Sequence, residues 1–332
     1  MTRPRIALMC TGGTIDSLGA SRLDLAWYTE TGQRLDDGEM LAALPELSEF
    51  ADVEQIASPR RPSYEITSRD WLALAGAVNG LLARPDIAGV VVTHGTNTLE
   101  ETAYFLHLVT VPPKPVVLVG AMRPANGPGS EGQLNLLRAV QVAADPAARG
   151  LGALVVMNDN IHGARDVTKT HTFRPDTFRS PDAGPLGIAD ADGRIVFYHR
   201  PFHPPSGRPL FAVAQLSDLP RVDVVVSHVG ADGALVDAAV AAGCRGLVNA
   251  GTGAGRPTAG EQAAMDRAAQ AGVVVCQASR VGSGRVSRSP GMAARGVVAA
   301  DNLPAWKARV LLLLALTKTS DPEAVQDMFD RL

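Results

Sequence analysis

The sequence predicts an α/β protein with two domains, each with a mainly parallel sheet flanked by helices. Apolar runs rich in β-branched residues alternate with helix-like segments, a pattern typical of parallel strands that are covered on both faces. A proline-rich stretch without helical periodicity interrupts this alternation after residue 195, and the alternation then resumes over a shorter length. The chain has 332 residues, which suits one large or two medium domains.

The larger domain, residues 1–195, is expected to be flavodoxin- or Rossmann-like. A further helix within it is predicted to begin with a capping box at residues 98–101 (TLEE) and to end near Leu108, before two prolines. The predicted strands are residues 6–9, 87–93, 115–119 and 151–157, and the other predicted helices are residues 38–47, 68–82 and 133–144.

Residues 196–219 are predicted to form a linker, because they are rich in proline and lack the period of a helix. The smaller domain, residues 220–332, repeats the alternation of strands and helices. Its predicted strands are residues 222–227, 246–249 and 272–276, and its predicted helices are residues 235–242, 259–271 and 305–317.

Composition excludes several kinds of partner. The formal net charge of −3 gives no footprint for nucleic acid, and no stretch approaches the roughly 18 apolar residues of a membrane span. Cys10, Cys244 and Cys276 match no zinc spacing and are expected to be free thiols in a reducing compartment. The histidines show no metal-binding pairing, so no metal site is expected. The N-terminus lacks the features of a signal peptide, so we expect a cytoplasmic protein.

Two glycine-flanked threonine segments stand at the ends of predicted strands. Residues 11–14 (TGGT) follow the first strand, and residues 93–98 (THGTNT) follow the second. Sites in open α/β sheets form beyond the carboxyl ends of the strands, so these segments and the one leading to Lys169 are expected to share a site. Each motif alone is weak evidence, because most such segments are turns in which a threonine caps a helix.

The residue types in these segments suit acyl transfer. A threonine hydroxyl is a useful nucleophile only when a base removes its proton as it attacks, and a lysine with a lowered pKa or a hydrogen-bonded tyrosine can do so. Glycines leave N–H groups free to face an oxyanion, which is worth about 3–4 kcal/mol per donor. Thr14, Thr96 and Lys169, with Gly13 and Gly95 beside the threonines, are therefore candidate site residues.

Several long motifs occur in order along nearly the whole chain. They are residues 11–15 (TGGTI), 92–103 (VTHGTNTLEETA), 120–124 (GAMRP), 157–159 (MND) and 163–170 (GARDVTKT). In these motifs the chain resembles the bacterial-type L-asparaginases and asparaginase/glutaminases. The resemblance implies hydrolysis of a side-chain amide through a covalent acyl-enzyme, without metal or cofactor. It also implies a homotetramer assembled as a dimer of dimers.

The resemblance also implies residue roles. Thr14 matches the nucleophile, and Tyr28 matches the tyrosine of a mobile loop that closes over the substrate. Thr96 and Lys169 match the second threonine and its lysine, and which threonine acts first stays open. Ser63 matches the serine that holds the substrate α-carboxylate. The leading substrate is L-asparagine, and the alternative is glutamine or an amide or lactam without a free α-ammonium.

Asn97 departs from the family pattern. The family usually has Asp at this position, as a ligand of the substrate ammonium and a partner of the lysine. The family's usual Glu from a neighbouring subunit is also missing, because residues 267–300 contain no acid. Asn97 therefore predicts weaker binding of an ammonium and an easier loss of the proton from Lys169, unless Glu131, Glu65 or another acid supplies the charge.

Other classes of protein fit less well. Residues 251–255 (GTGAG) follow a predicted strand, but the third glycine is misplaced for dinucleotide binding. No G-x-S-x-G motif of a serine hydrolase occurs. A non-catalytic ligand-binding homologue is the second alternative to an amidohydrolase, and the joint presence of Thr14, Tyr28, Thr96 and Lys169 argues against it.

Overall fold

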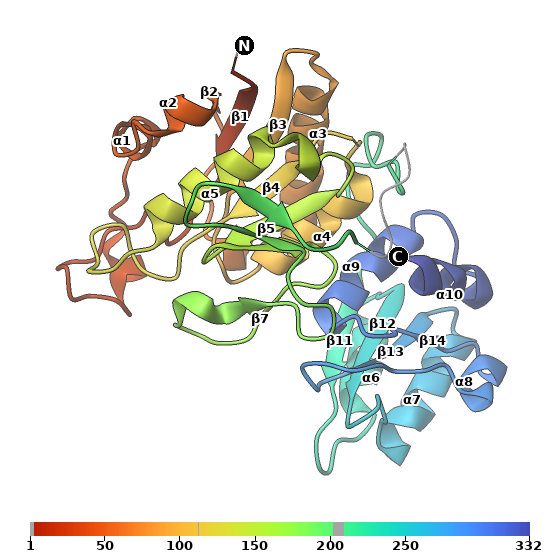
Figure 1. Cartoon of the computed structure of the whole chain (residues 1–332). Helices are drawn as coiled ribbons and strands as arrows, with labels where there is room; N and C mark the ends of the chain where they lie inside the picture. The colour runs from red at the N-terminus through yellow and green to blue at the C-terminus, as the bar shows by residue number, and fades with distance from the viewer. Residues whose placement is uncertain (1–2, 112, 202–208) are drawn as a thin grey trace. The chain divides into compact units, whose positions relative to one another are not determined.

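The chain divides into two compact units, Met1–Gln215 and Leu216–Leu332 (Figure 1). The structure is a computed structural model, and it describes residues 3–111, 113–201 and 209–332. Each unit is a layered α/β assembly with its own largely parallel sheet, which confirms the predicted fold class.

The first unit is built on a sheet with strand order β10-β9-β6-β5-β4-β3-β1-β2 in the described residues. The five strands from β2 to β5 are mutually parallel, and β6, β9 and β10 continue the sheet with antiparallel pairing. The order β2-β1-β3-β4-β5 is flavodoxin-like, and its reversal point lies between β1 and β3. The strands are β1 (Arg5–Cys10), β2 (Asp52–Ile56), β3 (Ile87–Thr93), β4 (Val116–Val119), β5 (Ala153–Met157), β6 (Asn160–Gly163), β9 (Gly187–Ala189) and β10 (Ile195–Phe197).

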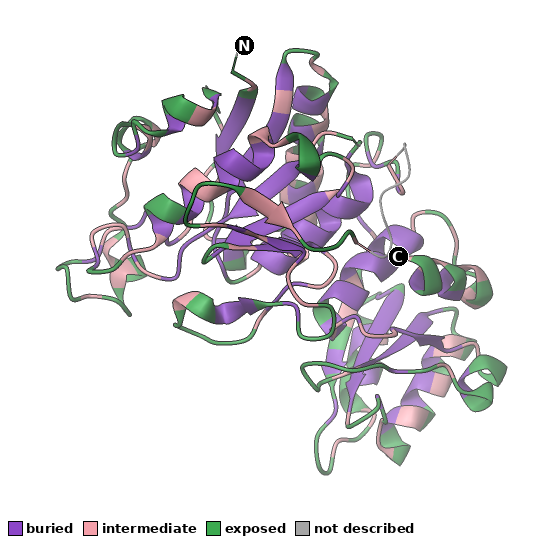
Figure 2. Ribbon diagram, in the orientation of Figure 1, coloured by how far each residue is buried: buried purple, intermediate pink, exposed green. Residues whose placement is uncertain are grey.

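Helices cover the central strands, which are buried almost throughout (Figure 2). Alternate residues of β1, namely Ile6, Leu8 and Cys10, join a cluster with side chains of α1, α2 and α5. α3 and α4 contact each other and also pack on strands of the sheet, α3 on β3 and α4 on β4 and β5. The helices are α1 (Asp37–Ala42), α2 (Leu47–Phe50), α3 (Ser68–Ala83), α4 (Leu99–Val109) and α5 (Gly132–Ala144).

Two helix predictions need correction. The single helix predicted over residues 38–47 is two short helices, α1 and α2, because Pro45 has no N–H to continue the first one. The capping box predicted at Thr98 is wrong in its bonding. Thr98 stands at the N-cap of α4 but makes no side-chain capping bond, and its hydroxyl donates to the Ser63 carbonyl at 2.7 Å instead.

The segment after β5 reverses direction at once. Asn158 and Asp159 have φ values of 51° and 62°, and β5 and β6 pair antiparallel across them. Left-handed residues at both central positions are typical of a tight hairpin turn. This turn leads through β6 toward a small two-stranded sheet of β7 (Thr168–Lys169) and β8 (Phe178–Arg179), which carries Lys169.

The sheet of the first unit extends past the predicted domain end at residue 195. β10 pairs with β9 through Phe197, so the first residues of the predicted linker 196–219 belong to a strand. Residues 202–208 of that predicted linker lie outside the described residues.

The second unit has a parallel sheet of order β11-β12-β13-β14 in the described residues. α6, α7 and α8 share a core with the sheet through residues such as Val236, Met265 and Met292. α9 packs against β11, β12 and β13, and α10 packs against β14 and α9. The elements are β11 (Val222–Val226), β12 (Gly246–Gly251), β13 (Val274–Ser279), β14 (Val298–Ala299), α6 (Ala234–Ala241), α7 (Ala259–Gln270), α8 (Pro290–Ala294), α9 (Ala305–Ala315) and α10 (Pro322–Arg331).

Candidate active site

A cavity of about 560 Å³ lies where the chain leaves β1 and β3, at the reversal point of the first sheet. This is the position where open α/β sheets bind their ligands. Every site residue predicted from the sequence lines it: Gly13, Thr14, Tyr28, Ser63, Gly95, Thr96, Asn97 and Lys169.

The two threonine segments are joined because β1 and β3 are parallel neighbours. Cys10 pairs with Thr93 at the end of the ladder. Just beyond, the backbone N–H of Thr11 donates to the Thr93 carbonyl at 3.2 Å, and the Thr11 hydroxyl donates to the same oxygen at 2.7 Å. The sheet therefore brings together residues that are about eighty positions apart in the sequence.

Gly13 and Gly95 are required for their backbones to come this close. A Cβ on Gly13 would lie 2.7 Å from the Cα and the N of Gly95, and the φ of Gly13 is +130°. A Cβ on Gly95 would lie 2.5 Å from the Ser63 Oγ. Any larger residue at either position would push apart the segments that carry Thr14, Thr96 and Ser63.

His94 holds the Gly95 peptide and stands outside the chemistry. It is 1% exposed, and burial lowers its pKa to about 4, so the ring is neutral near pH 7. Its Nδ1 donates to the Gly95 carbonyl at 2.8 Å, since a carbonyl oxygen only accepts. His94 fixes the peptide on which Gly13 packs.

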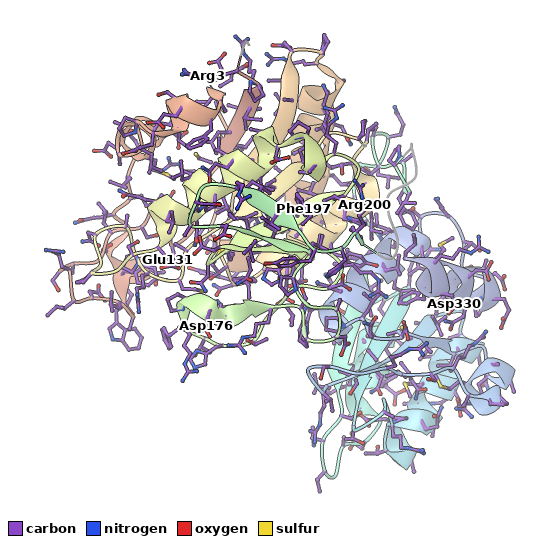
Figure 3. All side chains as sticks on the ribbon, in the orientation of Figure 1. Arg3, Glu131, Asp176, Phe197, Arg200 and Asp330 are labelled. Atoms are coloured by element: carbon purple, nitrogen blue, oxygen red, sulfur yellow. The ribbon has the colours of Figure 1, made fainter. Side chains whose placement is uncertain are left out.

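Thr14 and Tyr28 form the first hydroxyl pair of the cavity. Their Oγ1 and Oη atoms are 2.8 Å apart, and Thr14 is 8% exposed. Burial raises the pKa of Tyr28 above its usual value, and the charges of Glu131 and Asp24 add to that rise. Glu131 stands just before α5 and is labelled in Figure 3. Tyr28 is therefore held in its protonated form near neutral pH.

The loop that carries Tyr28 is fastened at its base. The side chain of Asn126 accepts from the Gly19 N–H and donates to the Gly19 carbonyl, both at 2.9 Å. The Ala125 N–H also donates to the Ser17 carbonyl at 2.8 Å. Beyond this clamp, residues 20–27 are mostly exposed and lead to a short helical turn, Tyr28–Thr31.

Thr96 and Lys169 form the second pair. The Lys169 Nζ donates to the Thr96 Oγ1 at 3.0 Å. The pKa of Lys169 is lowered, chiefly by burial, while the charge of Glu100 acts in the opposite direction. Glu100 also accepts from the Lys169 backbone N–H at 3.2 Å. The direction matches the prediction made from Asn97, but burial is its main cause and Glu100 supplies a carboxylate that the sequence did not suggest.

Ser63 stands at the edge of the cavity as a buried hydroxyl, 4% exposed, at the start of a short helical turn, Ser63–Glu65. Its position is fixed by the hydrogen bond from the Thr98 hydroxyl to the Ser63 carbonyl and by the close packing of Gly95. Asn97 lies in the same lining and is exposed, and its side chain makes no hydrogen bond to another described residue. It is therefore free to contact a substrate.

Several lining residues gave no signal in the sequence. Arg34 lines the cavity and pairs with the fully buried Asp16, with 3.4 Å between Nη1 and Oδ1. Tyr64 and Phe173 also line it and are 64% and 60% exposed. Isolated charged and aromatic residues in loops have no period or spacing by which they could be singled out.

The second unit shows what the other glycine-rich loop and the arginine-rich stretch do. Thr252 and Arg256 exchange two backbone hydrogen bonds of 2.8 Å, so residues 251–255 close on themselves as a hairpin. Three arginines of the arginine-rich stretch form ion pairs with acids of the same unit. The pairs are Arg285 with Asp301, Arg288 with Glu323, and Arg295 with Asp266.

The described residues give no sign of a metal or disulfide framework. They contain no cluster of three or more His, Cys, Asp or Glu side chains placed to hold a metal ion. Cys10, Cys244 and Cys276 are free and buried. Among the described helices, none has the length and apolarity needed to span a bilayer.

Both units match known family models. Residues 5–203 match the model described as "Asparaginase, N-terminal", and residues 221–329 match the "Glutaminase/Asparaginase C-terminal domain". The chain therefore belongs to the asparaginase family, whose members are amidohydrolases.

Individual relatives agree with this assignment over nearly their whole length. "L-asparaginase 2" of Bacillus subtilis is 40% identical over 98% of this chain and 86% of the relative. "Probable L-asparaginase periplasmic" of Haemophilus influenzae is 40% identical over 98% of this chain and 93% of the relative. The crystal structure of "Probable Cytoplasmic L-asparaginase from Campylobacter jejuni" has a TM-score of 0.95 at 37% identity, covering 99% of this chain and 100% of that one.

Proposed function

We propose that this amidohydrolase cleaves the side-chain amide of L-asparagine or of a closely related compound through an ester on Thr14. The observation that carries the proposal is the presence of two threonine hydroxyls in one cavity, each within 3.0 Å of a group able to move its proton. A binding protein would need neither Tyr28 nor Lys169 in that relation to a threonine.

In the acylation step the Thr14 Oγ attacks the amide carbon while its proton passes toward Tyr28. The raised pKa of Tyr28 disfavours a tyrosinate, so Tyr28 acts as a relay that gives up its own proton as it accepts one. The backbone N–H groups of Thr14 and Thr96 donate to no other described residue, so they can face the oxyanion. The C–N bond breaks, and ammonia leaves with the relayed proton.

In the second step water attacks the ester carbonyl, and Thr14 leaves with a proton. Lys169, with its lowered pKa, is suited to accept a proton through the Thr96 hydroxyl. The same pair can share the first proton transfer, and the arrangement supports either order. Ser63 would hold the substrate carboxylate at the edge of the cavity.

Ammonia release and mass spectrometry test this proposal. Wild-type protein with L-asparagine, L-glutamine and other amides should release ammonia, and a rapid acid quench should trap an acyl adduct on the peptide containing Thr14. Thr14→Ala should lose at least about a thousandfold in kcat, and Thr14→Ser should keep part of it. Near wild-type activity in Thr14→Ala would refute the nucleophile. No ammonia from any amide, with intact ligand binding, would favour the binding homologue.

The assembly and the location are also part of this proposal. A homotetramer, assembled as a dimer of dimers, is favoured by the resemblance, and light scattering of the purified protein tests it. A cytoplasmic location is favoured by the three buried free thiols. Fractionation of the source cells would test it, because recovery of the protein in the periplasm would contradict it.

A further inference from the structure

The described part of the cavity wall presents basic side chains and no carboxylate. Among the described residues that line it, the basic side chains are Arg34, Lys169 and His171, and none is Asp or Glu. A substrate group that enters this cavity therefore meets positive or neutral side chains on every described side.

The acid that pairs with Arg34 does not line the cavity. Asp16 is 0% exposed and pairs with Arg34 at 3.4 Å and with Arg60 at 3.2 Å. A Cβ on Gly12 would lie 2.8 Å from the Arg34 Nη1, so the guanidinium covers the turn that precedes Thr14. Asp16 is thus paired with arginines inside the protein and does not line the cavity, whereas Arg34 does.

The acid nearest to Lys169 in the hydrogen-bond network also lies outside the lining. Glu100 is 6% exposed, does not line the cavity and accepts from the Lys169 backbone N–H at 3.2 Å. Glu131, which accepts from the Met122 N–H, and Glu65 also lie outside the lining residues. Asn97 contributes a neutral amide to the lining, at the position where the family usually has the carboxylate of an Asp. An ammonium beside Asn97 would gain no charged partner among the described lining residues.

The mouth of the cavity suits an uncharged group. Tyr64 and Phe173 line it and remain 64% and 60% exposed, so two aromatic surfaces stand ready beside the polar interior. A neutral substituent on the substrate can pack against them, whereas an ammonium cannot gain a salt bridge there.

We propose that the preferred substrates are ω-amides that carry a carboxylate but no free α-ammonium, either unsubstituted or N-acylated at that position. This inference rests on the proposed amidohydrolase function and names its substrate class. L-Asparagine is then a poorer substrate than the same molecule without its positive charge.

The test compares kcat/KM for L-asparagine, succinamate and N-acetyl-L-asparagine on the full-length protein in its native assembly. Succinamate is asparagine with the α-ammonium replaced by hydrogen. At least one of the two analogues without the α-ammonium should exceed L-asparagine by about tenfold or more, the size of one lost charge-assisted hydrogen bond. A value for L-asparagine equal to or above both analogues would overturn the inference while leaving the amidohydrolase function standing. No ammonia from any of the three would instead defeat the proposed function.

A matched pair of variants locates the effect. Asn97→Asp places a carboxylate in the lining without changing its shape, and it should move the ratio of kcat/KM for L-asparagine over succinamate upward by about tenfold. Asn160→Asp makes the same change on β6, away from the lining residues, and should leave that ratio unchanged. An unchanged ratio in Asn97→Asp, or an equal shift in both variants, would contradict the assignment to this cavity wall.

Discussion

The two hydroxyl pairs of the cavity look alike in distance and differ in electrostatics. Thr14 is 2.8 Å from Tyr28, and Thr96 is 3.0 Å from Lys169. Burial acts on both partners, yet it raises the pKa of Tyr28 and lowers that of Lys169, because each is driven toward its neutral form. The same physical cause makes one partner a poorer proton donor and favours the neutral form in which the other can accept a proton.

The difference assigns complementary tasks to the pairs. A neutral lysine can accept a proton and hold it, whereas a neutral tyrosine gives up its own proton as it accepts one. Tyr28 comes from an exposed loop, and Lys169 comes from a short strand whose backbone is bonded to buried Glu100. In the proposed mechanism the relay therefore belongs to an exposed loop and the base to a hydrogen-bonded strand.

The largest expected effect is on the fixed base. Lys169→Met should lower kcat about a thousandfold, because general base catalysis is typically worth about a hundredfold to ten-thousandfold. Ammonia release measures this loss. Lys114→Met is the matched control, since Lys114 donates to the Arg84 carbonyl and does not line the cavity. Activity within about tenfold of wild type in Lys169→Met would show that the second pair is not needed.

A smaller loss is expected at the relay. Tyr28→Phe should lower kcat about a hundredfold, because the hydroxyl at 2.8 Å from Thr14 is removed while the ring still covers the cavity. Tyr64→Phe changes the same atom on an exposed residue of the same lining, and steady-state assays should find it within about threefold of wild type. Equal losses in the two variants would mean that the relay has no special role.

The free energy of unfolding should report on the close contact between Gly95 and Ser63. Gly95→Ala should lower the free energy of unfolding by about 1–3 kcal/mol, because its Cβ would meet the Ser63 Oγ at 2.5 Å. Gly76→Ala is the control: it lies within α3 with nothing inside 4 Å of the added carbon, and it should be neutral or stabilising by up to about 1 kcal/mol. Urea unfolding measures both. Equal stability of the two variants would contradict the close packing of Gly95 against Ser63.

The smallest expected effect is a shift in the pH profile of kcat/KM, which should differ between the two hydroxyl pairs. As a base, Lys169 requires its neutral form, so kcat/KM rises with pH through its pKa. Glu100 raises that pKa, so Glu100→Gln should move the rising limb of the pH profile to lower pH. Glu131 raises the pKa of Tyr28, so Glu131→Gln should move only the falling alkaline limb to lower pH. Identical shifts in the two variants would show that the pairs titrate as one unit.

The strands and loops that form this site could be predicted from patterns in the sequence. The buried strands β1 and β3 and the threonine segments after them follow from apolar runs and from the rule that parallel strands deliver their ends to one edge. Tyr28 and Ser63 entered through the family resemblance alone, since no spacing connects either residue to Thr14. Asn97 and Lys169 were found from motifs and lie in the same lining.

The remaining features depend on tertiary contacts that a linear pattern does not encode. Glu100 was interpreted as part of a capping box, and only the fold reveals that it accepts from Lys169. Arg34 and Asp16 are eighteen residues apart in an irregular segment, and their pairing depends on the path of that loop. The break between α1 and α2 was marked by Pro45, and it could have been predicted from that residue.

The hydrogen bonds between Gly19 and Asn126 fasten the base of the N-terminal loop, and the mostly exposed residues 20–27 lie beyond them. Asn126 follows β4, so the base of the loop is attached to the same sheet that carries Thr14. A short segment tethered at its base has few conformations to explore. In the proposed mechanism this attachment limits how far Tyr28 can move away from Thr14.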